Sequence, residues 1–156
     1  MLIKQVRNAA LAVFVFSIAL LAAESPFAGT WKMNADKSKL AGADAVQNVT
    51  VQYEVTDDTL KATVQGASMQ GQPVNFTYEA KLDGTPGTAS GSDTFDSIAF
   101  QRVSTHVLKA TAKKGDKVVY TDRRVVSKDG KSLTITRTGT DSQGKPYHET
   151  LVFDKQ

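Results

Sequence analysis

The chain has 156 residues, no cysteine and two histidines, and 22% of its residues are charged. The absence of cysteine excludes disulfides, thiolate zinc sites, iron–sulfur clusters and cysteine nucleophiles. No catalytic serine–histidine–aspartate pattern, P-loop or dinucleotide-binding fingerprint is present either. An apolar content of 40% is too high for a disordered chain and too low for a multi-span membrane protein. We therefore expect one globular domain that is not an enzyme and needs no cofactor.

The first 23 residues have the pattern of a signal peptide. Lys4 and Arg7 precede an apolar run from Ala9 to Leu21, and two alanines then offer a cleavage site. The run of about 13 residues is shorter than the ~20 that a membrane-spanning helix needs. An uncleaved anchor helix is the alternative. We predict export to the periplasm or the extracellular medium, a mature domain over residues 24–156, and no membrane span after cleavage.

Removal of the signal changes the charge of the protein. Of the 19 Lys and Arg residues, two lie in the signal, so the mature domain keeps 17 against 16 Asp and Glu, a net charge of +1 instead of +3. A nearly balanced surface gives no reason to expect nucleic acid or an anionic membrane as a partner. We expect a monomer whose partner is a small molecule.

From Val46 onward, apolar and polar residues alternate with a period of two, which is typical of strands with one buried face. Val49, Val51 and Tyr53 share one parity, for example, and the residues between them are polar. The alternating runs cover residues 49–55, 60–64, 74–82, 95–103, 107–112, 118–126, 133–138 and 147–153. Before Val46 the chain has room for only one short turn after the first strand.

Turn sequences separate these runs at regular intervals. Gly115, Gly130 and Gly144 each lie in a short polar turn, 15 and 14 residues apart, which corresponds to one strand and one tight turn. Consecutive hairpins make an antiparallel meander, and closure into a barrel removes its exposed edges. We therefore predict an all-β fold, an up-and-down barrel of about eight to ten strands that can enclose one small ligand. The breaker-rich stretch Gly84–Asp93 is expected to be a mobile loop at one barrel end.

The segment Phe27–Asn34, with Gly-Thr-Trp at its centre, resembles the first strand of the calycin superfamily, in which lipocalins and fatty-acid-binding proteins open with Gly-x-Trp. Residues 124–137 and 151–155 are similar to the last strands of that superfamily. The mature chain also resembles small exported bacterial proteins with a lipocalin-like domain, through Gly29–Lys32 and the Asn-x-x-Lys-Ser-Lys that begins at Asn34. The resemblance implies a barrel around a ligand cavity.

One departure from the superfamily bears on function. Fatty-acid-binding proteins hold the ligand carboxylate with an Arg-x-Tyr pair in the last strand, and the matching positions here are Leu151 and Phe153. The resemblance therefore does not imply fatty-acid binding.

Three arginines, Arg102, Arg124 and Arg137, share the parity of the apolar residues of their strands. A buried guanidinium needs an anion, and its bidentate geometry suits a carboxylate or a phosphate. We interpret the three as candidate ligand-binding residues. Three alternatives remain open: internal salt bridges to Asp122 and Glu149, an arginine packed against the tryptophan at the closed barrel end, or positions at strand ends in water.

Aromatic residues of the inward parity are the second set of candidates, because large rings line either a pocket or a solid core. Tyr53, Phe76, Tyr78, Phe100 and Tyr120 are the predicted ligand contacts, with Trp31 and Phe153 as further wall residues. His106 or His148 would be needed to ligate haem iron in such a barrel, and a surface position is the commoner alternative. We assign no metal site.

These observations give a functional hypothesis and one rival. The hypothesis is an exported lipocalin-like barrel that binds a small hydrophobic ligand, which an acidic head group would orient against the arginines. The rival is a barrel without a cavity that acts through its surface, as an envelope-associated or protein-interaction module. The presence of a cavity of ligand size distinguishes the two.

Overall fold

The computed structural model describes residues 23–156, so the expected signal peptide lies outside the described residues except for Ala23. Within this range the chain forms strands and one turn of 3-10 helix. They are β1 (Gly29–Met33), η1 (Ala35–Lys37), β2 (Val46–Thr56), β3 (Thr59–Ser68), β4 (Pro73–Lys81), β5 (Asp83–Ser90), β6 (Ser97–Ser104), β7 (Val107–Lys114), β8 (Lys117–Val126), β9 (Ser132–Thr140) and β10 (Pro146–Lys155). In the same range, no helix has the length and hydrophobicity that crossing a bilayer requires.

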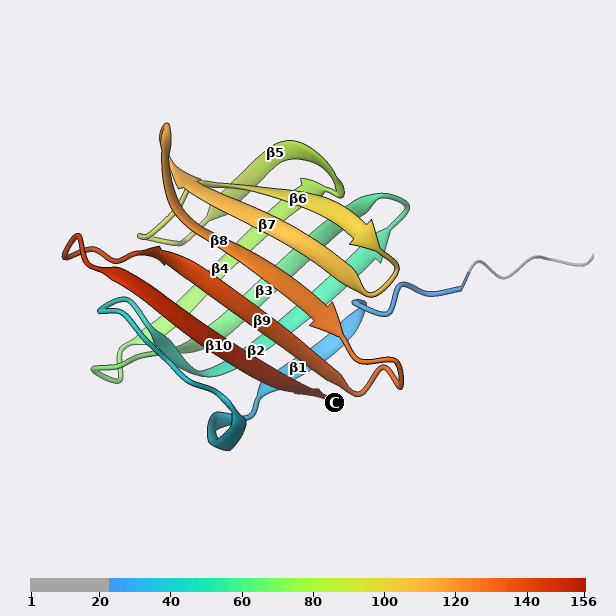
Figure 1. Cartoon of the computed structure of the whole chain (residues 1–156), viewed down its shortest axis with the longest axis horizontal. Helices are drawn as coiled ribbons and strands as arrows, with labels where there is room; N and C mark the ends of the chain where they lie inside the picture. Colours follow the sequence, from blue (N-terminus) through green and yellow to red (C-terminus); the bar gives the residue numbers. More distant parts are fainter. Residues whose placement is uncertain (1–22) are drawn as a thin grey trace, which may run out of the picture.

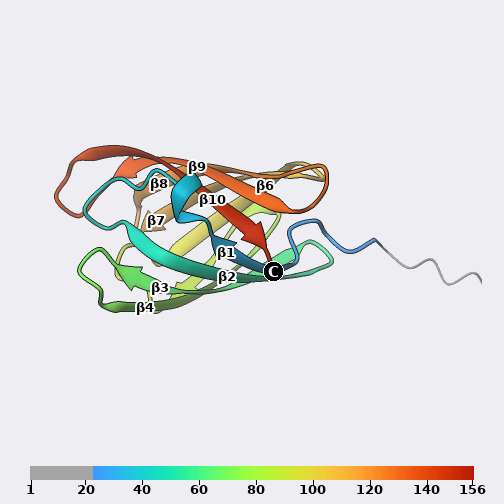
Figure 2. The same ribbon diagram turned by 90° about the horizontal axis from the view of Figure 1, so that it is seen from below.

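The strands form a closed antiparallel barrel in which each strand pairs with its neighbours in sequence (Figure 1). The barrel closes between the first and the last strand, where Trp31 of β1 lies opposite Lys155 of β10. Figure 2 shows that the barrel is flattened, with β2, β3 and β4 on one side and β8, β9 and β10 on the other. The all-β meander closed into a barrel, predicted from the two-residue alternation, is confirmed.

In β2 the alternation also predicted correctly which side chains face inward. Val51 and Tyr53 are buried and Gln52 between them is exposed. The turn glycines at 115, 130 and 144 have φ angles of 57°, 71° and 77°, a backbone conformation that glycine adopts without steric cost. Each of these tight turns therefore reverses the chain between two paired strands, as the spacing of the glycines indicated.

The two ends of the barrel differ. The turns between β2 and β3, β4 and β5, β6 and β7, and β8 and β9 lie at the same end as the C-terminus (Figure 1), which we call the closed end. Trp31 is fully buried there and donates a hydrogen bond from Nε1 to the Phe27 carbonyl oxygen at 2.8 Å. The Lys155 ammonium lies 5.3 Å from the centre of the indole ring. A lysine, and not one of the three arginines, therefore covers this tryptophan.

The closed end is filled with apolar side chains of the residues next to its turns. The fully or almost fully buried members are Leu60, Leu82, Leu108, Val126 and Leu133. These aliphatic side chains exclude water from this end, so that any internal space has to lie toward the opposite end.

The expectation of a mobile loop over Gly84–Asp93 is wrong for most of that stretch, because residues 83–90 form β5. Gly87 explains the difference, since a Cβ atom on it would collide with the Glu79 carbonyl oxygen and lie 2.6 Å from Ala80 Cα on β4. Gly87, whose residue type is typical of loops, thus allows β5 to approach β4 closely. Pairing of β5 with β4 is limited to three residue pairs.

We predict that Gly87→Ala destabilises the protein, because the new methyl group has no space beside the β4 backbone. The expected loss in the free energy of unfolding is roughly 1–3 kcal/mol, measured by urea denaturation. Thr88→Ala is the matched control, since Thr88 is exposed on the same strand. Equal stability of the two variants would contradict the close packing of β4 and β5.

Candidate ligand-binding cavity

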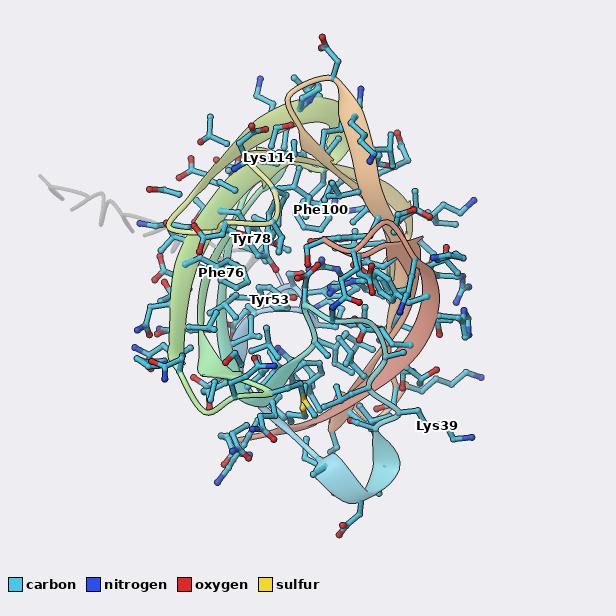
Figure 3. The ribbon with its side chains drawn as sticks, turned by 90° about the vertical axis from the view of Figure 1, so that its left-hand side faces the viewer. Lys39, Tyr53, Phe76, Tyr78, Phe100 and Lys114 are labelled. Carbon is cyan, nitrogen blue, oxygen red and sulfur yellow. The ribbon has the colours of Figure 1, made fainter. Side chains whose placement is uncertain are left out.

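The barrel contains a cavity of about 860 Å³ at the end opposite Trp31, which we call the open end. Figure 3 looks into the barrel from this side. Residues 41–45 between β1 and β2 and residues 91–95 between β5 and β6 form part of the mouth. The volume lies within the range of small-molecule sites, roughly 300–1,000 Å³. The structure therefore does not have the solid core that the rival hypothesis requires.

The walls of the cavity are mainly apolar. Phe95 lies at the centre of an aromatic cluster, with its ring 5.6 Å from Phe76 and 5.5 Å from Tyr120, both in edge-to-face geometry. Aliphatic side chains on facing strands complete the walls. They are Val49 and Val51 of β2, Val64 of β3, Ile135 of β9 and Leu151 of β10. A ligand in this space would exchange water for hydrocarbon and aromatic surface.

The floor of the cavity is built around Arg124, whose side chain is 1% exposed. Its Nη1 donates to the hydroxyl oxygens of Tyr53 at 2.7 Å and Tyr78 at 2.8 Å. Its Nε and Nη2 donate to the two carboxylate oxygens of Asp122 at 2.9 and 3.0 Å. The guanidinium also lies 4.8 Å from the centre of the Phe100 ring. Arg124 therefore links β8 to β2 and β4 across the interior of the barrel.

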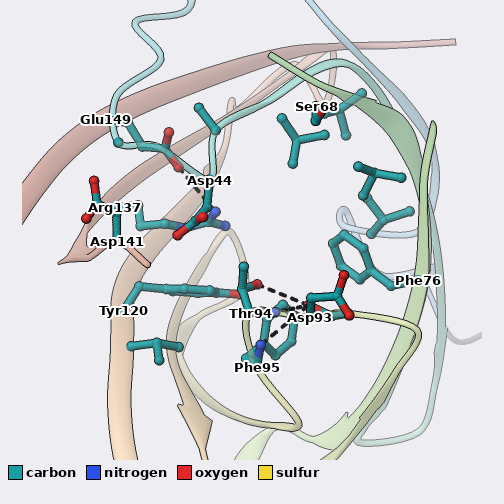
Figure 4. Close-up of a pocket in the computed structure, with 18 of the residues that line it drawn as sticks. Asp44, Ser68, Phe76, Asp93, Thr94, Phe95, Tyr120, Arg137, Asp141 and Glu149 are labelled. Atoms are coloured by element: carbon teal, nitrogen blue, oxygen red, sulfur yellow. Dashed lines mark hydrogen bonds and ion pairs between the residues drawn. The ribbon is translucent and has the colours of Figure 1, made fainter. Parts of the chain in front are cut away.

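Asp122 is shared with a second arginine. Arg137 Nη2 lies 3.2 Å from Asp122, and its Nη1 lies 3.2 Å from Glu149. The guanidinium carbon is 4.0 Å from the centre of the Tyr120 ring. Figure 4 shows Arg137 and Glu149 across the cavity from Phe76. Two guanidiniums and two carboxylates thus form one buried network, in which the formal charges cancel when both carboxyls are ionised.

The two carboxyl groups of this network titrate differently. Burial alone would raise the pKa of Asp122, but Arg124 and Arg137 outweigh it and hold that pKa below its ordinary value. For Glu149, burial raises the pKa and Arg137 offsets this only in part. The geometry agrees, because Asp122 receives hydrogen bonds from both guanidiniums and Glu149 from one. Asp122 is therefore the anion on which the network depends.

Six of the eight predicted site residues line the cavity, and the other two do not. The six are Tyr53, Phe76, Tyr78, Tyr120, Arg124 and Arg137. Phe100 is fully buried, with its ring against Arg124. The side chain of Arg102 is 41% exposed and pairs with Asp58 at 3.3 Å. Arg102 thus lies at a strand end and is exposed to solvent. Arg124 and Arg137 form salt bridges inside the barrel. A role of these residues in holding a ligand stays a prediction.

Several cavity residues were not identified from the sequence, because they lie in loops. Asp44 and Asp141 line the mouth, and Asp141 accepts hydrogen bonds from the backbone N–H groups of Ala43 and Lys145. The Asp-Ser-Gln-Gly-Lys turn that begins at Asp141 indicated a tight turn but not that its first side chain faces the cavity. Loop residues have no alternation from which such a direction can be read.

Neither histidine belongs to the cavity. His106 precedes β7 at the closed end, and His148 is exposed on the outer face of β10. A haem in the cavity would thus receive no imidazole ligand from the residues that line it. Across residues 23–156, no group of histidine and carboxylate side chains has a geometry suited to a metal ion.

Comparisons with known proteins agree with the barrel fold. No family model and no curated protein matches the chain. The crystal structure of Rv2717c from M. tuberculosis matches 85% of this chain and 94% of its own, with a TM-score of 0.55 and 12% identity. A redesigned β-barrel, b11L5F_LGL, covers 85% of this chain and 93% of its own, with a TM-score of 0.49 and 13% identity. At these identities the likeness to Rv2717c shows the β-barrel fold alone.

We predict that Asp122→Asn is strongly destabilising, because it leaves two buried guanidiniums without their shared anion. The expected loss in the free energy of unfolding is about 3–5 kcal/mol. Asp58→Asn is the matched control, because it removes the exposed partner of Arg102 and is expected to cost less than about 1 kcal/mol. Chemical denaturation of both variants measures the difference. Losses of similar size would show that the Asp122 network does not stabilise the barrel.

The depressed pKa of Asp122 also predicts a pH dependence. Its ionised form is favoured in the folded state, so its contribution is present above the ordinary pKa of 3.8 and is lost as the pH falls through the lower folded value. We expect the wild-type free energy of unfolding to decrease steeply in this acid range. Asp122→Asn, which cannot titrate at this position, is expected to give a flatter curve. Parallel curves for the two proteins would contradict this assignment.

Proposed function

We propose that this protein binds one small, mainly apolar molecule inside its barrel. The observation that carries this proposal is the cavity of about 860 Å³, with apolar walls and a polar floor. Burial of apolar ligand surface contributes roughly 25 cal/mol per Å², so the walls would supply most of the affinity. The few polar groups at the floor would fix the orientation of the ligand.

The proposal includes a lipocalin-like character and export. The Gly-Thr-Trp segment at residues 29–31 and the burial of Trp31 at the closed end support a barrel of the calycin type. The charged and apolar pattern of residues 1–23 supports export. An exported barrel of this kind would bind its ligand outside the cytoplasm.

We also propose a binding protein and not an enzyme. The titratable groups at the floor, Asp122, Arg124 and Arg137, are hydrogen-bonded to one another and to tyrosine hydroxyls. In that arrangement the carboxylate is neutralised and is not poised to remove a proton from a substrate. Over the residues that the structure describes, the sheet closes on itself and has no terminal strand for pairing with a second copy, which supports a monomer.

To test this proposal, a larger side chain is introduced into the cavity. Val64→Phe adds a ring to a cavity-lining position of β3, and Val125→Phe adds the same ring to β8 at a position that does not line the cavity. Fluorescence titration with 2-(dimethylamino)-6-propylnaphthalene, a neutral apolar dye, measures binding. We expect one dye per wild-type protein, seen as a saturable change in emission intensity, and an affinity lowered at least about tenfold by Val64→Phe through steric exclusion.

The control variant Val125→Phe is expected to bind the dye like the wild type. Native mass spectrometry of the purified wild-type protein would in addition reveal a co-purifying small molecule by its mass. Absence of saturable dye binding by the wild type, or equal binding by the wild type and Val64→Phe, would overturn the proposed function.

A further inference from the structure

The floor of the cavity presents hydrogen-bond donors that the protein itself does not use. The hydroxyl oxygens of Tyr53 and Tyr78 are 3.2 Å apart, and both accept a hydrogen bond from Arg124 Nη1. The two phenols have two protons between them, and only one can lie in the bond that joins their oxygens. One phenolic O–H of this pair is therefore left without an acceptor among residues 23–156.

Every carboxylate oxygen at the floor, in contrast, already has at least one donor within the protein. Both oxygens of Asp122 accept from Arg124, and one of them also accepts from Arg137. Glu149 accepts from Arg137 through Oε1 and from the Ala41 N–H through Oε2. Arg137 makes three hydrogen bonds with its five N–H groups. At the tyrosine pair the unused capacity includes the spare phenolic proton, so a ligand group that meets this proton is expected to be an acceptor.

The charges indicate that this acceptor is uncharged. At the floor, Asp122 and Glu149 balance Arg124 and Arg137. The mouth adds three carboxylates and two ammonium groups, those of Asp44, Asp93, Asp141, Lys114 and Lys117. A ligand anion would thus find no excess of positive charge, and burial of an unpaired anion is costly.

We propose that the ligand turns an uncharged hydrogen-bond acceptor, a ketone, ester or amide carbonyl, toward the floor and receives there the spare phenolic proton of the Tyr53–Tyr78 pair. This inference rests on the proposed function and names the ligand class. It replaces the acidic head group that the parity of the arginines indicated.

Two properties of the pair suit this role. Burial raises the pKa of Tyr53 well above its ordinary value of 10.0, against the opposing effect of Arg124, so the phenol keeps its proton at neutral pH. Both tyrosines line the cavity, and the bonds from Arg124 fix the positions of their oxygens. A donor held in this way loses little conformational freedom when a ligand binds.

The test uses three dyes that share one ring system. They are methyl 6-(dimethylamino)-2-naphthoate, which has a neutral carbonyl, the corresponding free carboxylate, and 2-(dimethylamino)-6-propylnaphthalene, which has no acceptor at that position. Fluorescence titrations at neutral pH give the dissociation constant of each. For the wild type we expect the ester to bind about fivefold more tightly than the propyl dye and at least about tenfold more tightly than the carboxylate.

The double variant Tyr53→Phe/Tyr78→Phe then tests the source of the proton, because either single variant leaves the other phenol with a free proton. The double variant is expected to weaken binding of the ester about fivefold more than binding of the propyl dye, because only the ester uses the hydroxyl. Thr63→Val, which removes an exposed hydroxyl from the outer face of β3, is the matched control and is expected to change neither. A purely structural role of the tyrosines would weaken both dyes equally.

The outcomes separate the two proposals. If none of the three dyes saturates the wild type, the proposed function fails. If the propyl dye binds but the carboxylate binds more tightly than the ester, the inference of a neutral acceptor fails and the function stands. If the ester is preferred and the double variant Tyr53→Phe/Tyr78→Phe retains that preference, the assignment of the donor to this pair is overturned.

Discussion

The interior of this barrel depends on one carboxylate. Asp122 accepts hydrogen bonds from two buried guanidiniums and thereby makes it possible for Arg124 and Arg137 to lie inside an apolar barrel. Arg124 then connects the strand of Asp122 to the tyrosines of β2 and β4 on the other side. Without the shared anion, Arg124 would carry the desolvation cost of an unpaired charge and Arg137 would keep only its pair with Glu149. The polar floor is therefore one cooperative unit, and its geometry is set from several strands at once.

The same network explains why the barrel has a cavity at one end only. The closed end is filled by Trp31 and by aliphatic side chains, which pack without polar atoms that need partners. Above the network, the inward positions of β2 and β3 are valines, such as Val51 and Val64, and these are too short to meet the opposite wall. Apolar packing ends at the guanidinium layer, and the space above it remains open to the mouth.

Much of this arrangement is encoded in local sequence. Two-residue alternation and turn glycines are local signals, and they predicted the strands, the closed meander and the inward direction of Tyr53 and Arg124. Alternation gives the face of a strand on which a residue lies but not its depth along the barrel. Arg102 has the same parity as Phe100, yet it lies at a strand end and is exposed. The sequence also offered Asp122 as a partner, without deciding between a ligand and an internal salt bridge.

Two of the features that sequence reasoning missed have nonlocal causes. In the sequence, Gly87 is typical of a turn or loop. The structure shows why glycine suits a strand at this position, because a Cβ atom would collide with the β4 backbone. Phe95 was expected at the start of a strand, but it lies in the loop before β6 and packs between rings from β4 and β8. A loop side chain is placed by the strands that surround it, so its position emerges only after the barrel has formed.

The closure of the barrel has a practical consequence for engineering. The Gln156 backbone N–H donates to the Thr30 carbonyl oxygen at 3.0 Å, so the last residue lies directly beside β1. A short linker from Gln156 to the segment before β1 would join them at the closed end, away from the mouth. New termini placed in the exposed β8–β9 turn at Lys128, which does not line the cavity, would then give a circular permutant with its internal space unaltered.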